Sequence, residues 1–179
     1  MTARELSNFT VRVDVQLRLA IRADLPKLEW FGQYTHYRTL FKRAYREQQE
    51  GRRLMLVADC NDFPIGHVFI QLQSDENAIA DGYSRAYLYS LRVMELFRGR
   101  GIGTRLLREA EAHVRSRGFH WTTIAVAKEN GGALRLYERL GYQIFRDDPG
   151  IWSYRDESNE THWVNEPCWI LEKPLVDLH

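Results

Sequence analysis

Apolar and polar residues alternate near the start of the chain. Apolar residues occupy every second position from Phe9 to Ile21, and polar residues stand between them as far as Arg18. A period of two is typical of a β-strand with one buried face. The pattern therefore predicts an N-terminal strand over this range. Residues 1–8 are polar, lack the apolar core of a secretion signal, and are expected to form a flexible N-terminal tail.

Two helices are expected after this strand. Asp24 is a favourable N-cap residue, and Pro26 falls in the first turn, where its missing N–H costs little. We therefore expect a helix from this point to about Tyr34. A second helix is predicted from Thr39 to about Gln49 because one helical stripe carries Leu40, Phe41, Ala44, Tyr45 and Gln48.

The middle of the chain predicts strands. Leu54–Ala58 and Ile65–Leu72 flank a polar, proline-containing turn, which indicates a hairpin. A polar loop from Asp75 to Ser84 leads to a third strand, Ala86–Val93. A glycine-rich turn follows, and then a helix from Ile102 to about Ser116 that Gly118 ends.

The remaining elements carry similar signals. Trp121–Ala127 predicts a strand, and Asn130 caps a further helix that Gly141 closes. Tyr142–Arg146 and Cys168–Glu172 are the last expected strands. An acidic segment between them, Asp147–Pro167, is expected to be a long loop holding Trp152, Tyr154 and Trp163.

This order, β-α-α-β-β-β-α-β-α-β-β, predicts one α/β domain over residues 1–179. We expect a mixed, mostly antiparallel central sheet flanked by helices. The segment from Ala86 through the glycine turn to Ala127 fits a parallel strand-helix-strand unit.

Composition narrows the function classes. The chain has 179 residues, a formal net charge of +1 and 44% apolar residues, as in ordinary globular proteins. No apolar run approaches the roughly 18 residues of a membrane span, and the balanced charge predicts neither nucleic-acid nor membrane binding. Cys60 and Cys168 have no metal-ligand or redox spacing. We therefore expect free thiols, no metal and a cytoplasmic protein; a disulfide stays open.

The glycine turn carries the clearest functional signal. Gly99, Gly101 and Gly103 alternate with other residues where a strand passes into a helix. Glycine permits positive φ and leaves no Cβ in the way, so several amides can converge on one point. The helix N-terminus adds unpaired N–H groups and the positive end of its dipole. A pyrophosphate is the natural ligand, and Arg98 and Arg100 add matching charge.

Two other phosphate motifs do not fit this turn. A P-loop ends in Gly-Lys-Ser/Thr, which is absent here. The dinucleotide fingerprint needs Gly-x-Gly-x-x-Gly, but Gly103 comes one residue early and no first strand of a doubly wound sheet precedes it.

The turn resembles a known family. Arg98-x-x-Gly101-x-Gly103 is similar to the Arg/Gln-x-x-Gly-x-Gly/Ala signature of the GNAT superfamily of N-acetyltransferases. Two further features match in register: Asn130-x-x-Ala133-x-x-x-Tyr137, and the run from Tyr137 to Tyr142, which is similar to the family's Tyr-x-x-x-Gly-Phe. The resemblance extends over residues 17–175, with its specific motifs between residues 90 and 142.

The resemblance implies acetyl-CoA as co-substrate and assigns residues to it. Backbone groups of Leu91 and Val93 would bind the pantetheine arm at a splayed strand. Asn130 would contact the pantetheine side, and Tyr137 would lie near the thioester sulfur. The pyrophosphate would rest on the amides of the turn, which comprises Arg98, Gly99, Arg100, Gly101, Ile102, Gly103 and Thr104.

The expected reaction is direct attack of an amine on the thioester in a ternary complex. The amide of Val93 would donate to the oxyanion. Tyr137 would protonate the leaving thiolate as general acid, although a tyrosine on a helix face can also be a core residue. Family members often carry a glutamate where this sequence has Arg85 or Ala125, so the general base is left open. The candidates are Glu95, Tyr89, His67 or a chain of waters.

The acceptor is a small-molecule amine or a peptide amine, and the sequence does not separate the two. The aromatic and acidic residues of 147–167 suit a cationic ligand, but they also fit a solvated surface hairpin. The acidic residues on or near this loop are Asp147, Asp148, Asp156, Glu157, Glu160 and Glu166. Trp30, Tyr34, His36 and Tyr37 could form an opposite wall or pack between helices.

Two alternatives compete with an enzyme of this kind. A non-catalytic sensor would keep the glycine turn and bind acyl-CoA without transferring the group. A nucleotide-dependent transferase is disfavoured by the missing Gly-Lys-Ser/Thr. A homodimer is left open.

Overall fold

A seven-stranded mixed sheet forms the centre of the computed structural model, which describes residues 8–76 and 78–175. Its strand order is β1-β2-β3-β4-β5-β9-β6, and every neighbouring pair is antiparallel except β4 and β5. The strands are β1 (Gln16–Leu19), β2 (Arg53–Cys60), β3 (Phe63–Gln71), β4 (Arg85–Val93), β5 (Trp121–Ala127), β6 (Gln143–Asp148) and β9 (Cys168–Pro174). This arrangement confirms the predicted fold class.

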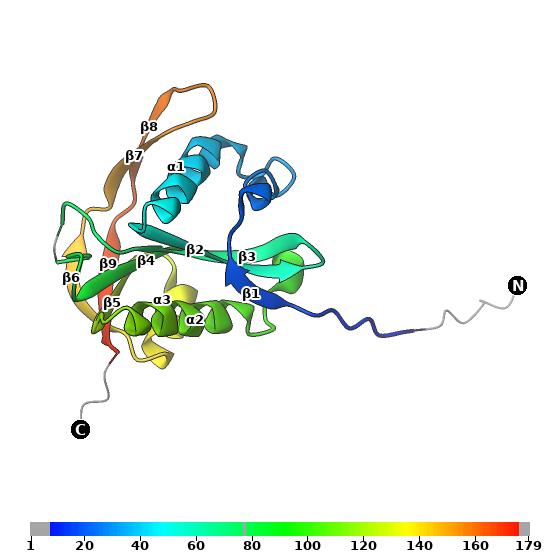
Figure 1. The fold of residues 1–179 in the computed structure, drawn as a ribbon. Helices are drawn as coiled ribbons and strands as arrows, with labels where there is room; N and C mark the ends of the chain where they lie inside the picture. Colours follow the sequence, from blue (N-terminus) through cyan, green and yellow to red (C-terminus); the bar gives the residue numbers. More distant parts are fainter. Residues whose placement is uncertain (1–7, 77, 176–179) are drawn as a thin grey trace, which may run out of the picture.

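Helices cover both faces of the sheet (Figure 1). Helix α1 (Arg38–Gln49) lies on one face, and α2 (Ile102–Ser116) and α3 (Gly131–Arg139) lie on the other. The larger core fills the α2 side, where Leu106, Leu107 and Val114 are fully buried. A smaller core under α1 contains Phe41 and Met55. The sheet is thus enclosed along its centre, as a parallel β4-β5 pair requires.

The long N-terminal strand was predicted wrongly. Only Gln16–Leu19 pairs with β2, and residues 8–15 run away from the body as an extended chain (Figure 1). Gln16 lies opposite Asp59, and β2 ends one residue later at Cys60. Earlier residues therefore have no strand to pair with. The apolar face of the pattern stays exposed, with Phe9 at 84% and Val11 at 69% of full exposure.

The predicted helix from Asp24 to Tyr34 is also wrong. Three short 3-10 turns stand there instead, at Arg22–Asp24, Lys27–Glu29 and Thr35–Tyr37. The Asp24 carboxylate reaches back to the amide of Ile21 at 2.8 Å and to the guanidinium of Arg18 at 2.6 Å, so it caps no forward helix.

Trp30 and Phe31 then interrupt the helical path. Both have positive φ, 44° and 58°, which no helix tolerates. The indole of Trp30 is buried, and its N–H donates to the carbonyl of Pro64 at 2.8 Å. A tertiary contact with the β2-β3 hairpin therefore overrides the local helix signal.

The other predicted elements are confirmed within a few residues. The β2-β3 hairpin turns at Asn61 and Asp62, both with positive φ. Asn130 caps α3 by accepting the amide of Ala133 at 3.1 Å, and Gly141 follows the helix with φ 93°. Both cysteines are buried free thiols.

The predicted long loop at 147–167 contains a hairpin. Strands β7 (Ile151–Arg155) and β8 (Thr161–Asn165) pair antiparallel and project past α1 (Figure 1). The hairpin contacts α1 through Thr39, whose hydroxyl donates to the carbonyl of Asp156 at 3.1 Å. The segment is therefore a hairpin and not a long loop.

Within the described ranges, no helix has both the length and the apolar character needed to cross a membrane.

Candidate functional site

Strands β4 and β5 part halfway along their length. Their parallel ladder runs from Arg85 opposite Trp121 to Leu88 opposite Ile124 and ends there. β5 continues to Ala127, paired only with β9 on its other side. The strand edges beyond Leu88 therefore face each other without a hydrogen-bond partner, and an extended ligand can pair with them.

A bulge in β4 prepares this edge. The register with β3 shifts between His67 and Phe69, and Ser90 takes a φ of 55°. After the bulge, the Met94 amide donates to Ile65 of β3 at 2.8 Å. Successive backbone amides point to opposite sides of a strand. The amides of Leu91 and Val93 therefore point to the open side, toward β5.

The glycine turn presents free amides. Gly99 and Gly101 have φ values of 72° and 77°. The first helical bond of α2 runs from the Arg105 amide to the Gly101 carbonyl at 3.0 Å. Among the described residues, the backbone amides from Gly99 to Thr104 have no acceptor. Leaving these amides without an acceptor costs free energy, and an anion that binds at the helix N-terminus offsets this cost.

The two arginines of the turn hold its backbone. Arg98 donates to the Val93 carbonyl at 2.9 Å, and Arg100 donates to the Leu96 carbonyl at 2.8 Å. Both side chains are exposed. Their charge therefore lies at the turn, where a diphosphate would need it.

Tyr137 lies on α3, on the face of the sheet opposite α1. It is 7% exposed and packs edge-to-face against Tyr142 with ring centroids 6.1 Å apart. Burial raises the pKa of the Tyr137 phenol to about 12. The phenol therefore keeps its proton at neutral pH, as a proton donor must.

A cleft opens on the α1 side of the parted strands. Its volume is about 580 Å³. Its walls come from α1, from β4 and β5, from β9 and from the β7-β8 hairpin, including Tyr37, Tyr87, Tyr89, Arg92, Ala125 and Trp152. The ring of Tyr37 lies 5.0 Å from that of Tyr154 on the hairpin. Tyr37 therefore packs against the hairpin at the edge of the cleft, whereas Trp30 belongs to the core.

The two cleft phenols of β4 are not bases. Tyr87 and Tyr89 stack at 5.5 Å. Burial raises the pKa of both phenols, and Tyr89 also hydrogen-bonds Arg53. Both therefore stay protonated at neutral pH and can donate hydrogen bonds to an acceptor molecule.

The other candidate bases lie outside the cleft. His67 is fully buried, and its pKa is lowered to about 3 by burial and by the charge of Arg92. Its ring packs on Phe69 at 4.8 Å, and it is a core residue. Glu95 is exposed on a 3-10 turn, Glu95–Phe97, that precedes the glycine turn. Arg85 pairs with Glu172 at 2.7 Å.

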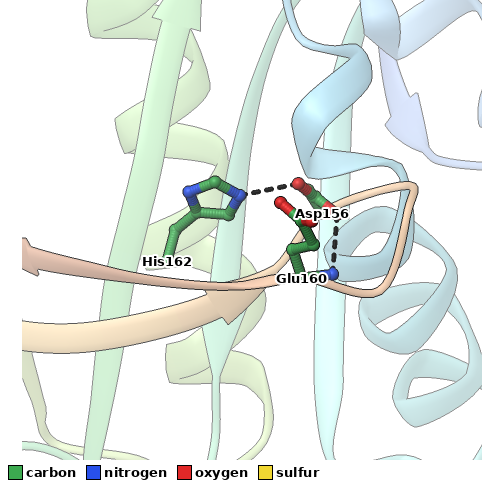
Figure 2. A group of neighbouring side chains, drawn as sticks. All are labelled: Asp156, Glu160 and His162. Carbon is green, nitrogen blue, oxygen red and sulfur yellow. Dashed lines mark hydrogen bonds and ion pairs between the residues drawn. The ribbon is translucent and has the colours of Figure 1, made fainter.

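A group of titratable side chains at the hairpin tip closes a turn (Figure 2). Asp156 accepts the amides of Ser158 and Glu160, each at 2.9 Å, and pairs with His162 at 2.6 Å. The His162 ring holds the pKa of Asp156 below its usual value. One carboxylate oxygen is thus already occupied by two amides, and the group stabilises the tip.

Arg92 was missed by the sequence analysis. It lies in the cleft, and its guanidinium stands 4.6 Å from the Tyr34 ring and 5.1 Å from the Tyr37 ring. Its position between Leu91 and Val93 in an apolar strand gave no sign of exposure to the cleft. Only the bulge at Ser90 turns it that way.

Fold and site together define an α/β protein with a glycine turn of unpaired amides beside an opened sheet. The amino-acid sequence matches the model of the Acetyltransferase (GNAT) family over residues 22–142. That match spans more than half of the chain, and the chain belongs to the GNAT family.

Relatives agree with this assignment. An uncharacterized N-acetyltransferase of Methanocaldococcus jannaschii is 33% identical over 108 residues, which cover 59% of this chain and 45% of that protein. The chain spans less than half the length of the curated relatives it matches.

Solved structures share the fold. Arabidopsis thaliana NAA60 in complex with acetyl-CoA superposes with a TM-score of 0.67 at 18% identity, covering 90% of this chain and 98% of that one. The ribosomal-protein-S18-alanine N-acetyltransferase from Escherichia coli gives 0.66 at 19%, covering 93% and 97%.

Proposed function

We propose that this chain is an N-acetyltransferase that moves an acetyl group from acetyl-CoA to an amine by direct attack in a ternary complex. One observation carries the proposal: the parted edges of β4 and β5 lead to a turn whose amides, from Gly99 to Thr104, have no acceptor in the described chain. An extended arm ending in a pyrophosphate matches both features.

The residues fit the co-substrate. Leu91 and Val93 offer backbone groups on the open side of β4 to the pantetheine arm. The turn amides and the charges of Arg98 and Arg100 bind the pyrophosphate. The Asn130 side-chain oxygen caps α3, which leaves its NH₂ group to contact the pantetheine. NAA60 was solved in complex with acetyl-CoA, and its shared fold supports the same ligand here.

The reaction balances without a further co-reactant. The acetyl thioester supplies the activated carbonyl. The neutral amine attacks its carbon, the C–S bond breaks, and the amine proton passes to a base. The Val93 amide donates to the oxygen as negative charge develops there. The thiolate leaves with a proton from Tyr137.

Tyr137 acts as an acid of modest strength. A free thiol has a pKa of ~8.5, below the pKa of about 12 of this phenol. Full proton transfer to the thiolate is therefore uphill, and much of the benefit is a hydrogen bond to the developing charge. Burial of Tyr137 on the α3 side keeps it apart from the acceptor cleft.

The base is assigned to Glu95 or to a water chain. A single residue separates Glu95 from the end of β4. Glu95 is therefore close in the chain to the proposed oxyanion donor. Because it is exposed, a water relay would have to connect it to the amine. Glu95→Gln should lower turnover and flatten the alkaline rise of its pH profile if Glu95 receives the proton; an unchanged profile assigns the proton to water.

An acceptor cleft favours an enzyme over a sensor. A protein that only reports acyl-CoA needs no second opening, whereas this chain has an aromatic-walled cleft of about 580 Å³ on the far side of the parted strands.

The two buried free thiols suit a reducing cytoplasm. A homodimer stays a proposal.

Release of CoA from acetyl-CoA in the presence of an amine panel tests the function. Free amino acids, polyamines, aryl amines and short peptides should be compared, with product mass confirming one added acetyl group. We expect CoA release with at least one acceptor class. Binding of acetyl-CoA without release for any class would replace the enzyme with a sensor.

A further inference from the structure

Arg92 is a cation held in place without a counter-ion. Among the described residues it makes no ion pair. Its Nη1 donates to the Ser90 hydroxyl at 2.7 Å, and its guanidinium lies over the rings of Tyr34 and Tyr37. These contacts fix its direction but leave its charge unneutralised. Burial lowers its pKa, and only the two tyrosines oppose that effect.

Neighbouring arginines of the cleft differ from Arg92. Arg43 and Arg53 also line it, and both pair with Glu47, at 2.8 and 2.6 Å. Their charge is satisfied by the protein. The guanidinium of Arg92 can therefore still bind an anionic group in the cleft, whereas the other two arginines are already paired.

The chemistry of guanidinium selects the ligand. A planar guanidinium binds a carboxylate through two parallel N–H bonds, and stacking on aromatic rings leaves its edge free for that purpose. A charge that is partly buried without a counter-ion is costly, and a ligand of opposite charge offsets that cost. The carboxylate of Glu166 lines the same cleft and suits the cationic form in which an amine arrives, whereas Asp148 there already pairs with Arg146 at 2.9 Å.

Arg92 also lies next to the reaction point. It is adjacent in sequence to Val93, the proposed oxyanion donor, and pairs across the sheet with His67 rather than with a solvent-facing residue. A carboxylate bound by Arg92 would thus lie on the cleft side of the strand that carries the proposed oxyanion donor. We propose that the acceptor is an amine bearing a carboxylate close to its nitrogen, and that Arg92 binds this carboxylate.

The inference rests on the proposed function and is tested by paired acceptors. The first pair is a free α-amino acid and its amide. The second is a dipeptide amide with aspartate in second position and its asparagine analogue. The two pairs distinguish an α-carboxylate from a side-chain carboxylate. Converting the α-carboxylate to an amide lowers the pKa of the amine and so leaves more of the amine neutral. Ionisation of the amine by itself therefore favours the amide, and a preference for the acid cannot arise from it.

The variants are Arg92→Met and, as matched control, Arg46→Gln. Arg46 is an exposed arginine of α1 outside the cleft lining. Wild type and R46Q should favour the acid of at least one pair by roughly 10- to 100-fold in kcat/KM. R92M should lose this preference through KM, while its thermal shift with acetyl-CoA is kept.

Two results overturn the inference alone: acetylation by wild type without preference for the acid in either pair, or a preference that R92M retains. CoA release from no amine at all overturns the proposed function, and the inference with it. Retention of the acetyl-CoA thermal shift by R92M shows that the variant is folded.

Discussion

Arg98 donates its Nε–H to the carbonyl oxygen of Val93 at 2.9 Å. This bond ties the first residue of the glycine turn to the last residue of β4. The proposed phosphate site and the proposed oxyanion donor are thereby held at a fixed separation. A ligand that fills the turn therefore lies beside the end of the strand that carries the proposed oxyanion donor.

Acetyl-CoA should stabilise the fold through the glycine turn. A ligand at 100 times its dissociation constant stabilises the native state by about 2.7 kcal/mol, which for a chain of this length raises Tm by roughly 5–10 °C. Gly101→Glu should abolish the rise, because the carboxylate enters the site of the phosphates. Differential scanning fluorimetry with and without ligand measures it.

Gly118→Glu is the control for that experiment. Gly118 follows the other end of α2, has a similar positive φ of 84° and has no atom within 4 Å of an added Cβ. Its backbone strain therefore matches that of Gly101→Glu, while the turn stays intact. Gly118→Glu should keep the ligand-induced rise, and an undiminished rise in Gly101→Glu would remove the turn from the cofactor site.

Tyr137→Phe should lower kcat by roughly 100-fold, near the low end for a general acid, because the phenol is a weak donor. The acetyl-CoA thermal shift should stay. Tyr142→Phe is the contrasting variant, since its hydroxyl bonds Glu111 at 2.9 Å and Thr122 at 3.1 Å in the core. It should lose about 1–3 kcal/mol of stability at unchanged kcat. Equal turnover in Tyr137→Phe and wild type would exclude the acid role.

His67 should make stability depend on pH. Its folded pKa of about 3 lies below the ordinary value of 6.5. Between these values the unfolded chain binds the proton and the folded chain does not, so stability is full above pH 6.5 and declines as pH falls toward 3. In urea unfolding, the free energy of unfolding should be lower at pH 5 than at pH 7. His67→Phe should reduce this difference by about 2 kcal/mol. An equal loss in both proteins contradicts this.

Gly150 should control the acceptor cleft. A Cβ there would lie 1.8 Å from the carbonyl oxygen of Glu166, at the base of the hairpin. Gly150→Ala should displace the hairpin and raise KM for the amine several-fold, with acetyl-CoA binding kept. Gly51→Ala, at φ 76° with open space around it, should cost only about 1–2 kcal/mol of backbone strain. Unchanged KM in Gly150→Ala would separate the hairpin from the acceptor site.

Local signals in the sequence were sufficient for most elements. Helices α2 and α3 have an apolar stripe and glycine after their ends, and these are properties of neighbouring residues. The same holds for the glycine turn, whose free amides follow from positive φ at Gly99 and Gly101. Prediction failed at residues 8–15 and at Trp30, because strand pairing and the Pro64 contact depend on residues far along the chain.

The sequence by itself determined most of the elements, the family signature and the place of the glycine turn, since each depends on short-range chemistry. Only the tertiary structure decided which way Arg92 points. Strict alternation would put Arg92 on the face of Ala86 and Leu88, in the core. The bulge at Ser90, forced by pairing with β3, turns Arg92 into the cleft, and no local pattern encodes a register that two strands set between them.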